Sequence, residues 1–395
     1  MKIRILISMV LSLSLIGCEG FFGDKTDISF IDTPEFTNRD VAYVPIQPII
    51  EGFQSPSDVL AGFDGLIYVV DAGTEEIIAY DQAGREQGRF SLPGVQKIAM
   101  DRKLNLLAIG TFDTIINEVP YELSTIYRVN LSTSSGFGLQ HAEVTNKLVH
   151  PYYFKSSFSS VDAEVQFTSV DVNSDNSYYA ARIGPRDNDN QIGGPDDGVV
   201  IFNKADEYVS NVFVSTNNGF FRGYFQTPLC LATYAKPPQS PSVSESKDFF
   251  IAMADPSLPI KVQAIQFNES EFGSSFNVQF LDFSDTSEAN DFLYRPGRFQ
   301  NPVDITITGD GTNYIFVLDA GSDSLYQFTS TGKEGINPPP GSSETKNIIA
   351  SFGGTGQEAT QFNNPSAIAY LDQIVYVCDQ GNGRLLRFKL TTDFD

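Results

Sequence analysis

Residues Ser351–Leu390 read SFGGTGQEATQFNNPSAIAYLDQIVYVCDQGNGRLLRFKL, and this stretch decides the fold because it recurs with drift earlier in the chain. Its landmarks are a Phe-Gly pair, a loop closing at Pro365, an apolar strand, a second strand ending in Asp379, a Gly-rich turn and a third strand. Two other copies superpose on it, FQSPSDVLAGFDGLIYVVDAGTEEIIAYDQAG at Phe53–Gly84 and FQNPVDITITGDGTNYIFVLDAGSDSLYQFTSTG at Phe299–Gly332. Short runs of period-two alternation separated by Gly, Asn and Asp turns indicate β-strands, and no long helical periodicity accompanies them.

Three weaker copies begin near Lys97, Thr168 and Pro228, so the chain contains six repeats. Each run is too short to bury its own faces, whereas stacking the repeats around an axis buries both faces of every sheet. The pattern therefore predicts an all-β fold, a six-bladed β-propeller of four-stranded antiparallel blades. Six blades of about 40 to 60 residues each take up nearly all of the chain, which indicates one folded domain.

The ring also has to close. After Leu390 only a few residues remain, so the last blade lacks its outer strand. The segment Asp40–Ile50, DVAYVPIQPII, is an extra strand ahead of the first blade. We predict that this N-terminal strand completes the sixth blade and ties the two ends of the propeller together.

The repeats share a proline before one strand and an aspartate at the end of the next, at Pro56, Pro302 and Pro365 and at Asp71, Asp319 and Asp379. This pattern resembles the NHL-repeat family. The resemblance implies a propeller that serves as a binding scaffold, but it leaves the chemistry open because propellers host many unrelated activities. Since the aspartates recur once per blade and precede Gly-containing turns, we expect them to accept backbone N–H bonds there.

The first residues predict the destination of the protein. Lys2 and Arg4 form a basic region, Ile5–Ile16 is apolar but short for a bilayer span, and Leu15–Cys18 resembles a bacterial lipobox. The lipoprotein resemblance implies cleavage before Cys18 and lipid on its thiol and amine. The alternative is an ordinary secretory signal with an incidental cysteine.

These observations divide the chain into a lipoprotein signal peptide at 1–17, a tether at 18–39 and the propeller at 40–395. Several acyl chains hold a protein durably on a membrane. Residue Glu19 follows the cysteine, where an aspartate would resemble an inner-membrane retention signal. We therefore expect a lipid-anchored protein of the bacterial cell envelope, at the outer membrane, facing either the periplasm or the cell surface.

The charge excludes one class of partner. The chain has 26 basic and 49 acidic residues and a formal net charge of −23, which repels phosphate backbones, so we expect no nucleic acid. The two remaining cysteines, Cys230 and Cys378, fall on blades that do not touch. We expect buried free thiols rather than a disulfide.

The innermost strands carry a second set of candidates. Where the family pattern has a small residue early in this strand, the chain has, in blade order, Asp58, Lys97, Ser169, Cys230, Asp304 and Ala367. We expect these positions near the mouth of the central channel. Asp58 and Lys97 lie on neighbouring blades and can pair, because unpaired buried charge is costly, whereas Asp304 has no partner in this column.

Three irregular segments of the second, third and fourth blades are expected on one rim: FDTIINEVPYELS (112–124), ARIGPRDNDNQIGGPDDGVV (181–200) and STNNGFFRGYFQTP (215–228). We hypothesise that a protein or glycan partner docks there. Arg and Tyr dominate interface energetics. The proposed anchors are Arg182, Arg186, Arg222 and Tyr224.

The run Asp187–Asn190 alternates oxygen ligands as a calcium loop does, but it lacks the glycine and the distal glutamate of an EF-hand. We expect a solvated acidic loop and no cofactor, with calcium or another divalent cation as the alternative. Only His141 and His150 exist, so a three-histidine zinc centre cannot form.

Two functions follow. The first is a binding or scaffold module for a protein or glycan partner. The alternative is a metal-dependent lactonase-type hydrolase with its site at the channel mouth. Six-bladed lactonases carry an N-terminal Glu-Gly-Pro, which Glu51-Gly52 resembles, but Phe53 stands at the proline position.

Overall fold

The computed structural model describes residues 41–185, 196–216, 219–221, 223–237, 245–271, 273–279, 292–338 and 345–394. The predicted signal peptide, lipobox and tether lie outside them. The described residues form β-strands joined by turns and a few short 3₁₀ segments, and they contain no α-helix. Among them, no helix has the length and apolar character needed to cross a bilayer.

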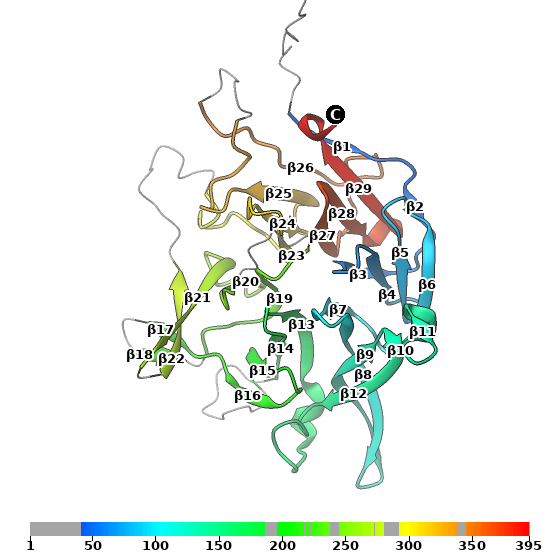
Figure 1. The fold of residues 1–395 in the computed structure, drawn as a ribbon. Coiled ribbons are helices and arrows are strands. Elements are labelled where there is room, and N and C mark those ends of the chain that lie inside the picture. Colours follow the sequence, from blue (N-terminus) through cyan, green and yellow to red (C-terminus); the bar gives the residue numbers. More distant parts are fainter. Residues whose placement is uncertain are drawn as a thin grey trace, which may run out of the picture. The chain divides into compact units, whose positions relative to one another are not determined.

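The described residues between 41 and 394 form six blades, each a mainly antiparallel sheet, arranged around a central axis (Figure 1). Blade 1 consists of β3 (Pro56–Ala61), β4 (Ile67–Asp71), β5 (Glu76–Tyr80) and β6 (Glu86–Ser91). Blade 2 consists of β7 (Lys97–Met100), β8 (Asn105–Ile116), β9 (Val119–Asn130) and β12 (Glu143–Val149). Blade 3 consists of β13 (Gln166–Val172), β14 (Tyr178–Ile183), β15 (Gly198–Phe202) and β16 (Tyr208–Asn211). The small β10 (Ser132–Thr133) and β11 (Gly136–Phe137) pair before β12.

The second half of the ring repeats this order with one addition. Blade 4 consists of β19 (Pro228–Thr233), β20 (Phe249–Met253), β21 (Val262–Ser270) and β22 (Gly273–Gln279). Its outer edge is extended by β17 (Val214–Thr216), which runs parallel to β22, and by β18 (Gly219–Phe221). Blade 5 consists of β23 (Pro302–Ile307), β24 (Ile315–Asp319), β25 (Ser324–Phe328) and β26 (Phe352–Gly353). Blade 6 contains β27 (Ala367–Leu371), β28 (Ile374–Asp379) and β29 (Arg384–Leu390).

The N-terminal segment closes blade 6, and the predicted six-bladed, all-β propeller is confirmed. Two short pieces, β1 (Tyr43–Pro45) and β2 (Ile50–Glu51), pair antiparallel with β29. Between the two pieces the Arg387 guanidinium donates to the carbonyl oxygens of Pro48 and Gln82, each at 2.7 Å. The single strand expected over 40–50 is therefore interrupted, and an arginine side chain fills the interruption.

Packing between blades forms the core. Six clusters of buried apolar side chains occur, one at each contact between neighbouring blades. One of them joins Val69 of blade 1 to Tyr376 of blade 6, so the first and last blades pack as the others do. Because every blade buries apolar surface against two neighbours, the ring is stabilised as a closed unit.

The repeated aspartates have the structural role expected of them. The Asp71 carboxylate accepts the backbone N–H groups of Gln54 and Ser55, at 2.9 and 2.8 Å. Asp319 accepts those of Gln300 and Asn301 in the same way. Each carboxylate thus fixes the linker that enters its own blade, which explains why the residue recurs.

Candidate functional site

The central channel narrows to a cavity of about 50 Å³. Asp58, Lys97 and Asp304 line it, together with Ser169, Asp171 and Lys236. The predicted pair is present, with the Lys97 ammonium 3.2 Å from an Asp58 carboxylate oxygen. The other Asp58 oxygen accepts the backbone N–H of Ile98 at 2.7 Å. Both oxygens of this buried carboxylate are therefore engaged within the wall.

Asp304 has hydrogen-bond partners that do not belong to the equivalent positions on the other innermost strands. One carboxylate oxygen accepts the N–H of Ile305 at 2.9 Å, and the other accepts the N–H of Ile368 on blade 6 at 2.8 Å. Backbone donors satisfy this side chain, and a comparison of side chains alone cannot reveal them. Asp304 is thus a link between blades 5 and 6.

The same link recurs at alternate blades. Asp58 of blade 1 bonds Ile98 of blade 2, and Ser169 of blade 3 accepts the N–H of Leu231 of blade 4 at 3.1 Å. The corresponding residues of the even blades are Lys97, Cys230 and Ala367. Only the odd blades have an acceptor side chain at this position, namely Asp58, Ser169 and Asp304, and the sequence shows this alternation. The alternation indicates a structural function for these residues.

Burial shapes the electrostatics of the channel. Burial raises the pKa of Asp58 to about 6, against the lowering effect of Lys97. Burial also raises the pKa of Asp304. Burial lowers the pKa of Lys97, but the nearby carboxylates Asp58 and Asp304 outweigh this effect and raise it above its ordinary value. The Lys236 ammonium, which sequence reasoning missed, contacts Asp171 in the same cavity.

These residues do not fit a divalent cation. An ion beside Asp58 would meet the Lys97 ammonium, and each oxygen of Asp304 already accepts a backbone N–H, so neither carboxylate is left free as a ligand pair. Across the described part of the chain, no three His, Cys, Asp or Glu side chains are grouped so that they can hold a metal. The geometry at Asp58 and Asp304 therefore does not support the hydrolase alternative.

Cys230 and Cys378 are free and buried, as expected. Burial raises the pKa of both thiols well above the ordinary value. Both therefore remain protonated near neutral pH. They act as small apolar side chains in the core.

The structure describes two of the four predicted anchors on the rim, Arg182 and Tyr224. Arg182 is 1% exposed, so its role as a surface anchor is wrong. Its guanidinium donates to the hydroxyl of Tyr153 at 2.9 Å and to the carbonyl of Asp196 at 3.0 Å. Tyr224 is partly buried, and its hydroxyl bonds the side chain of Gln263. Arg186, Arg222 and the run Asp187–Asn190 lie outside the described residues.

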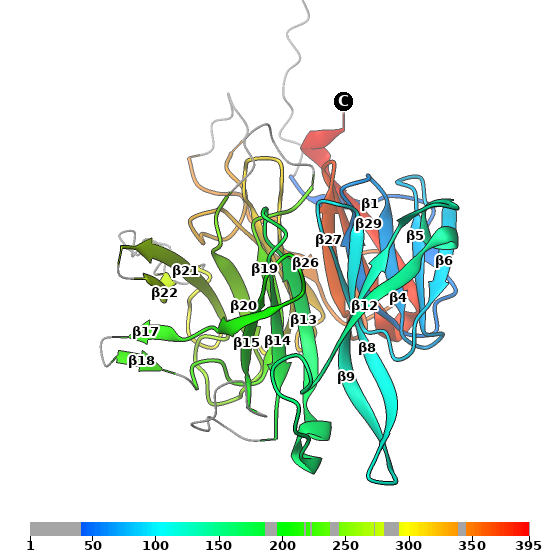
Figure 2. The same cartoon turned by 60° about the horizontal axis from the view of Figure 1, so that its bottom comes forward.

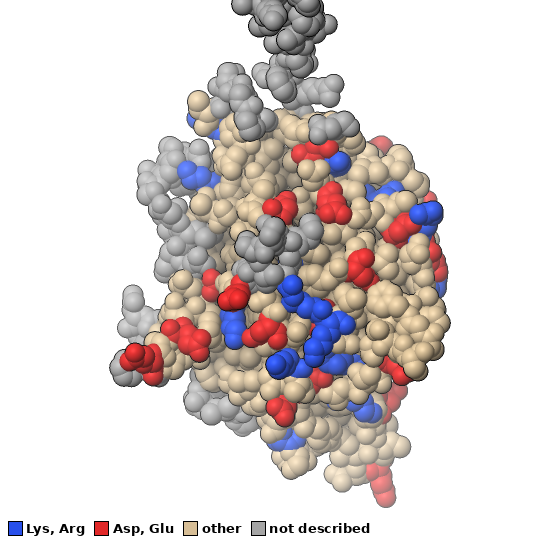
Figure 3. All heavy atoms as spheres, viewed as in Figure 1, with Lys and Arg blue, Asp and Glu red and all other residues tan. Residues whose placement is uncertain are grey.

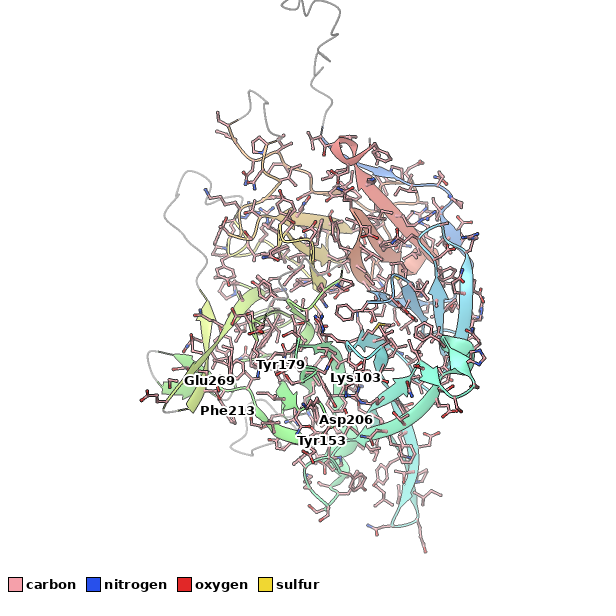
Figure 4. All side chains as sticks on the ribbon, viewed as in Figure 1. Lys103, Tyr153, Tyr179, Asp206, Phe213 and Glu269 are labelled. Atoms are coloured by element: carbon pink, nitrogen blue, oxygen red, sulfur yellow. The ribbon has the colours of Figure 1, made fainter. Side chains whose placement is uncertain are left out.

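Arg182 belongs to a buried polar network beneath the linker from blade 2 to blade 3. His150 lies 3.4 Å from Asp162, which also pairs with Lys155 at 2.9 Å. Burial, reinforced by the charge of Arg182, lowers the pKa of His150 to about 3. The imidazole is therefore neutral at physiological pH, and the network orders the linker (Figure 4 labels Tyr153 within it).

A long hairpin formed by two strands of blade 2 projects from one end of the propeller. Strands β8 and β9 have twelve residues each, whereas the second strands of the other blades have five or six. Their outer halves project beyond the neighbouring strands as a two-stranded ribbon, 110–124 (Figure 2). Asn117 and Glu118 turn the chain with φ of 51° and 69°, the left-handed values of a tight hairpin turn.

The two faces of this ribbon differ. Antiparallel register places Asp113 opposite Glu122 and Ile115 opposite Pro120, and all four residues are exposed. Ile115 is 73% exposed, the highest value among the large apolar side chains that the structure describes as exposed. We call these four residues the outer face of the ribbon.

The inner face rests on the body of the protein. Tyr121 packs edge-on against Phe158 of the linker, with ring centroids 4.8 Å apart. The Lys147 ammonium lies 3.6 Å from the centre of the Phe112 ring. Leu123 is fully buried. An isolated two-stranded hairpin is marginally stable in water, so these contacts brace the ribbon in its projecting position.

Basic side chains gather at the opposite end of the propeller. Figure 3 shows them near the centre of that face, interspersed with acidic ones. Arg102 and Lys103 contribute from the turn between β7 and β8, at the end of β8 opposite the ribbon tip, and Figure 4 labels Lys103. Arg102 lies over the ring of Phe63 at 5.6 Å.

No protein-family model matches the chain, and no curated protein matches it. Solved structures with a similar arrangement include an auxiliary nutrient binding protein from Bacteroides thetaiotaomicron, at 11% identity over 86% of this chain and 70% of that chain (TM-score 0.49). A PQQ-bound aldose sugar dehydrogenase from Streptomyces coelicolor matches at 10% identity over 89% and 98% (TM-score 0.49). Regucalcin, a calcium-binding protein from Agrobacterium tumefaciens, matches at 9% identity over 87% and 93% (TM-score 0.48). At this level of similarity no conclusion on function follows from these matches.

Proposed function

We propose that the chain is a lipid-anchored, NHL-like propeller of the bacterial cell envelope that acts as a binding or scaffold module for a protein or glycan partner. Lipid on Cys18 is the proposed anchor, in agreement with the lipobox-like Leu15–Cys18. The proposed docking surface is the end of the propeller that carries the β8–β9 ribbon.

The ribbon is the observation that carries this proposal. Its tip exposes Ile115 at 73% and Val119 at 46%, next to the exposed Pro120. Single exposed apolar residues are common, but Ile115 and Pro120 are cross-strand neighbours on the outer face, and Val119 lies beside them at the tip on the other face. The projection contributes nothing to closure of the ring, which β1 and β2 provide. A partner that covers the tip gives this extension a function.

The contacts of the channel residues also favour a binding site on the surface. The channel carboxylates of Asp58 and Asp304 each accept a backbone hydrogen bond from the next blade. Arg182, which has the lowest exposure among the arginines that the structure describes, holds the linker in place. Asp58, Asp304 and Arg182 thus have structural partners, which supports a binding surface outside the channel.

Site-specific photo-cross-linking in living cells tests the proposal. A photoreactive amino acid at Ile115 of the full chain is expected to form an adduct with a partner in the envelope. The control carries the same group at Glu269, an exposed residue of the β21–β22 hairpin at the outer edge of blade 4, away from the ribbon (Figure 4). The partner, once purified, should bind the wild type and not a variant in which Asn-Gly replaces 113–122. Equal binding by both proteins would remove the ribbon from the proposal.

A further inference from the structure

The outer face of the ribbon contains two carboxylates in direct opposition. Asp113 and Glu122 are cross-strand neighbours, and both are exposed. Within the described residues, neither has an ion-pair or hydrogen-bond partner. Like charges directly opposite each other destabilise an antiparallel pair. The register thus places two like charges opposite each other on a ribbon whose strands have no described strand beside them.

This arrangement is not forced by the fold. On the inner face of the same ribbon, Lys147 sits against Phe112, so a basic side chain is available one strand away and is used elsewhere. Exposed carboxylates on blade 1 do have partners, since Arg89 pairs with both Glu76 and Glu86.

We propose that the outer face binds an arginine or lysine side chain from an extended segment of a partner protein, an inference that rests on the proposed function. A cation placed between Asp113 and Glu122 relieves their repulsion and gains two charge-assisted contacts. Ile115 and Pro120 lie one pair further toward the tip, where they contact the apolar part of a long basic side chain or its neighbour.

The edges of the ribbon suit an extended partner. Strand β7 pairs with β8 only as far as Ile109, and β12 pairs with β9 only from Thr125 onward. The backbones of Thr111 and Ser124 bond the loop residues Pro93 and His150, and between Phe112 and Leu123 no described strand pairs with the outer edge of either strand. An added strand gains backbone hydrogen bonds there while its alternate side chains reach the outer face.

Other occupants fit less well. A second copy of this chain carries the same two carboxylates and the same net charge of −23, so a symmetric contact would bring like charges together. A glycan commonly stacks on aromatic rings, but the two ring-bearing residues of the ribbon, Phe112 and Tyr121, lie on the inner face against Lys147 and Phe158. A protein segment with a basic residue is the partner that the outer face complements.

Fluorescence anisotropy with the full lipidated chain in detergent tests the inference. The probe is a capped, labelled octapeptide of alternating arginine and valine, and the control peptide alternates glutamate and valine. Because any basic peptide is attracted to an acidic protein, titrations are done at about 150 mM salt, where distant charges are screened. The variant D113N/E122Q is compared with E269Q/E271Q, which changes the net charge equally at another exposed hairpin.

The arginine-valine peptide should bind the wild type and E269Q/E271Q equally, and D113N/E122Q about three- to tenfold more weakly, as expected for exposed charge pairs. Equal affinity for both variants overturns the inference, as does equal binding of the acidic peptide. Binding that requires calcium assigns the carboxylates to a metal and also overturns it. In these cases the adduct at Ile115 still supports the proposed function, whereas loss of that adduct removes both.

Discussion

Replacing Lys97 by methionine would test how the channel is held together. The side chain is mostly buried, at 18% exposure, and its ammonium lies 3.2 Å from the buried Asp58 carboxylate. Coulomb's law at that distance, with an effective dielectric constant of about 20, gives about 5 kcal/mol of attraction. Removing one partner of a buried pair costs about 3–5 kcal/mol, because the other charge stays uncompensated. Methionine has a similar length and keeps the apolar packing of the stem.

The cost should depend on pH. Burial already raises the pKa of Asp58 from 3.8 to about 6, and Lys97 is the main group that opposes this rise. Without Lys97 the pKa of Asp58 rises further. A carboxyl whose pKa is raised on folding contributes stability below its unfolded pKa, and this stability is lost as the pH rises through the folded value. Lys97→Met should therefore be mild at pH 5, where Asp58 is protonated, and severe at pH 8.

Urea unfolding at the two pH values measures the difference. We expect the loss of unfolding free energy at pH 8 to exceed that at pH 5 by about 2 kcal/mol or more, since one pKa unit corresponds to about 1.4 kcal/mol. Lys103→Met, an exposed lysine of the same blade, is the control and should change little at either pH. An equal loss for Lys97→Met at both pH values would show that packing, and not the charge of Asp58, determines the cost.

Three further predictions concern the anchor, the closure and the linker. Cys18→Ser should release the protein from membranes, and unchanged partitioning into detergent would contradict lipidation. Deleting 41–51 should expose the edge of β29 and abolish a single cooperative melt, because that edge then lacks β1 and β2; a melt like that of the wild type would mean that the ring closes without them. Arg182→Met should lower the unfolding free energy by about 1–3 kcal/mol, since it leaves Tyr153 and Asp196 without their donor. An unchanged unfolding free energy would contradict this structural role of Arg182.

The architecture was predictable because its signals are local. Proline before a strand, aspartate after one and glycine in the following turn recur at a spacing that fits one blade, and Asp71 and Asp319 bond the backbone as that pattern indicates. Closure by the N-terminal segment also followed from counting strands. Its interruption did not, because Arg387 enters the gap from a strand more than 300 residues away.

The candidate site was predictable only in part. Asp58 and Lys97 pair as expected from neighbouring positions in the repeat. Asp304 seemed unpartnered because its partners are backbone N–H groups, which every residue has and no pattern reveals. Arg182 appeared to be a surface anchor because it begins an irregular acidic segment, yet packing of the blade 2 to blade 3 linker buries it.

By itself, the sequence determined the number of blades, their strand order and the way the ring closes, because alternation and turn chemistry act between residues close in the chain. Only the tertiary structure decided which charged side chains are exposed. Arg182 is enclosed by a linker, whereas Asp113 and Glu122 are brought face to face by the register of two long strands and left in solvent. Burial and pairing depend on which distant segments of the chain come into contact, and these contacts form only in the folded protein.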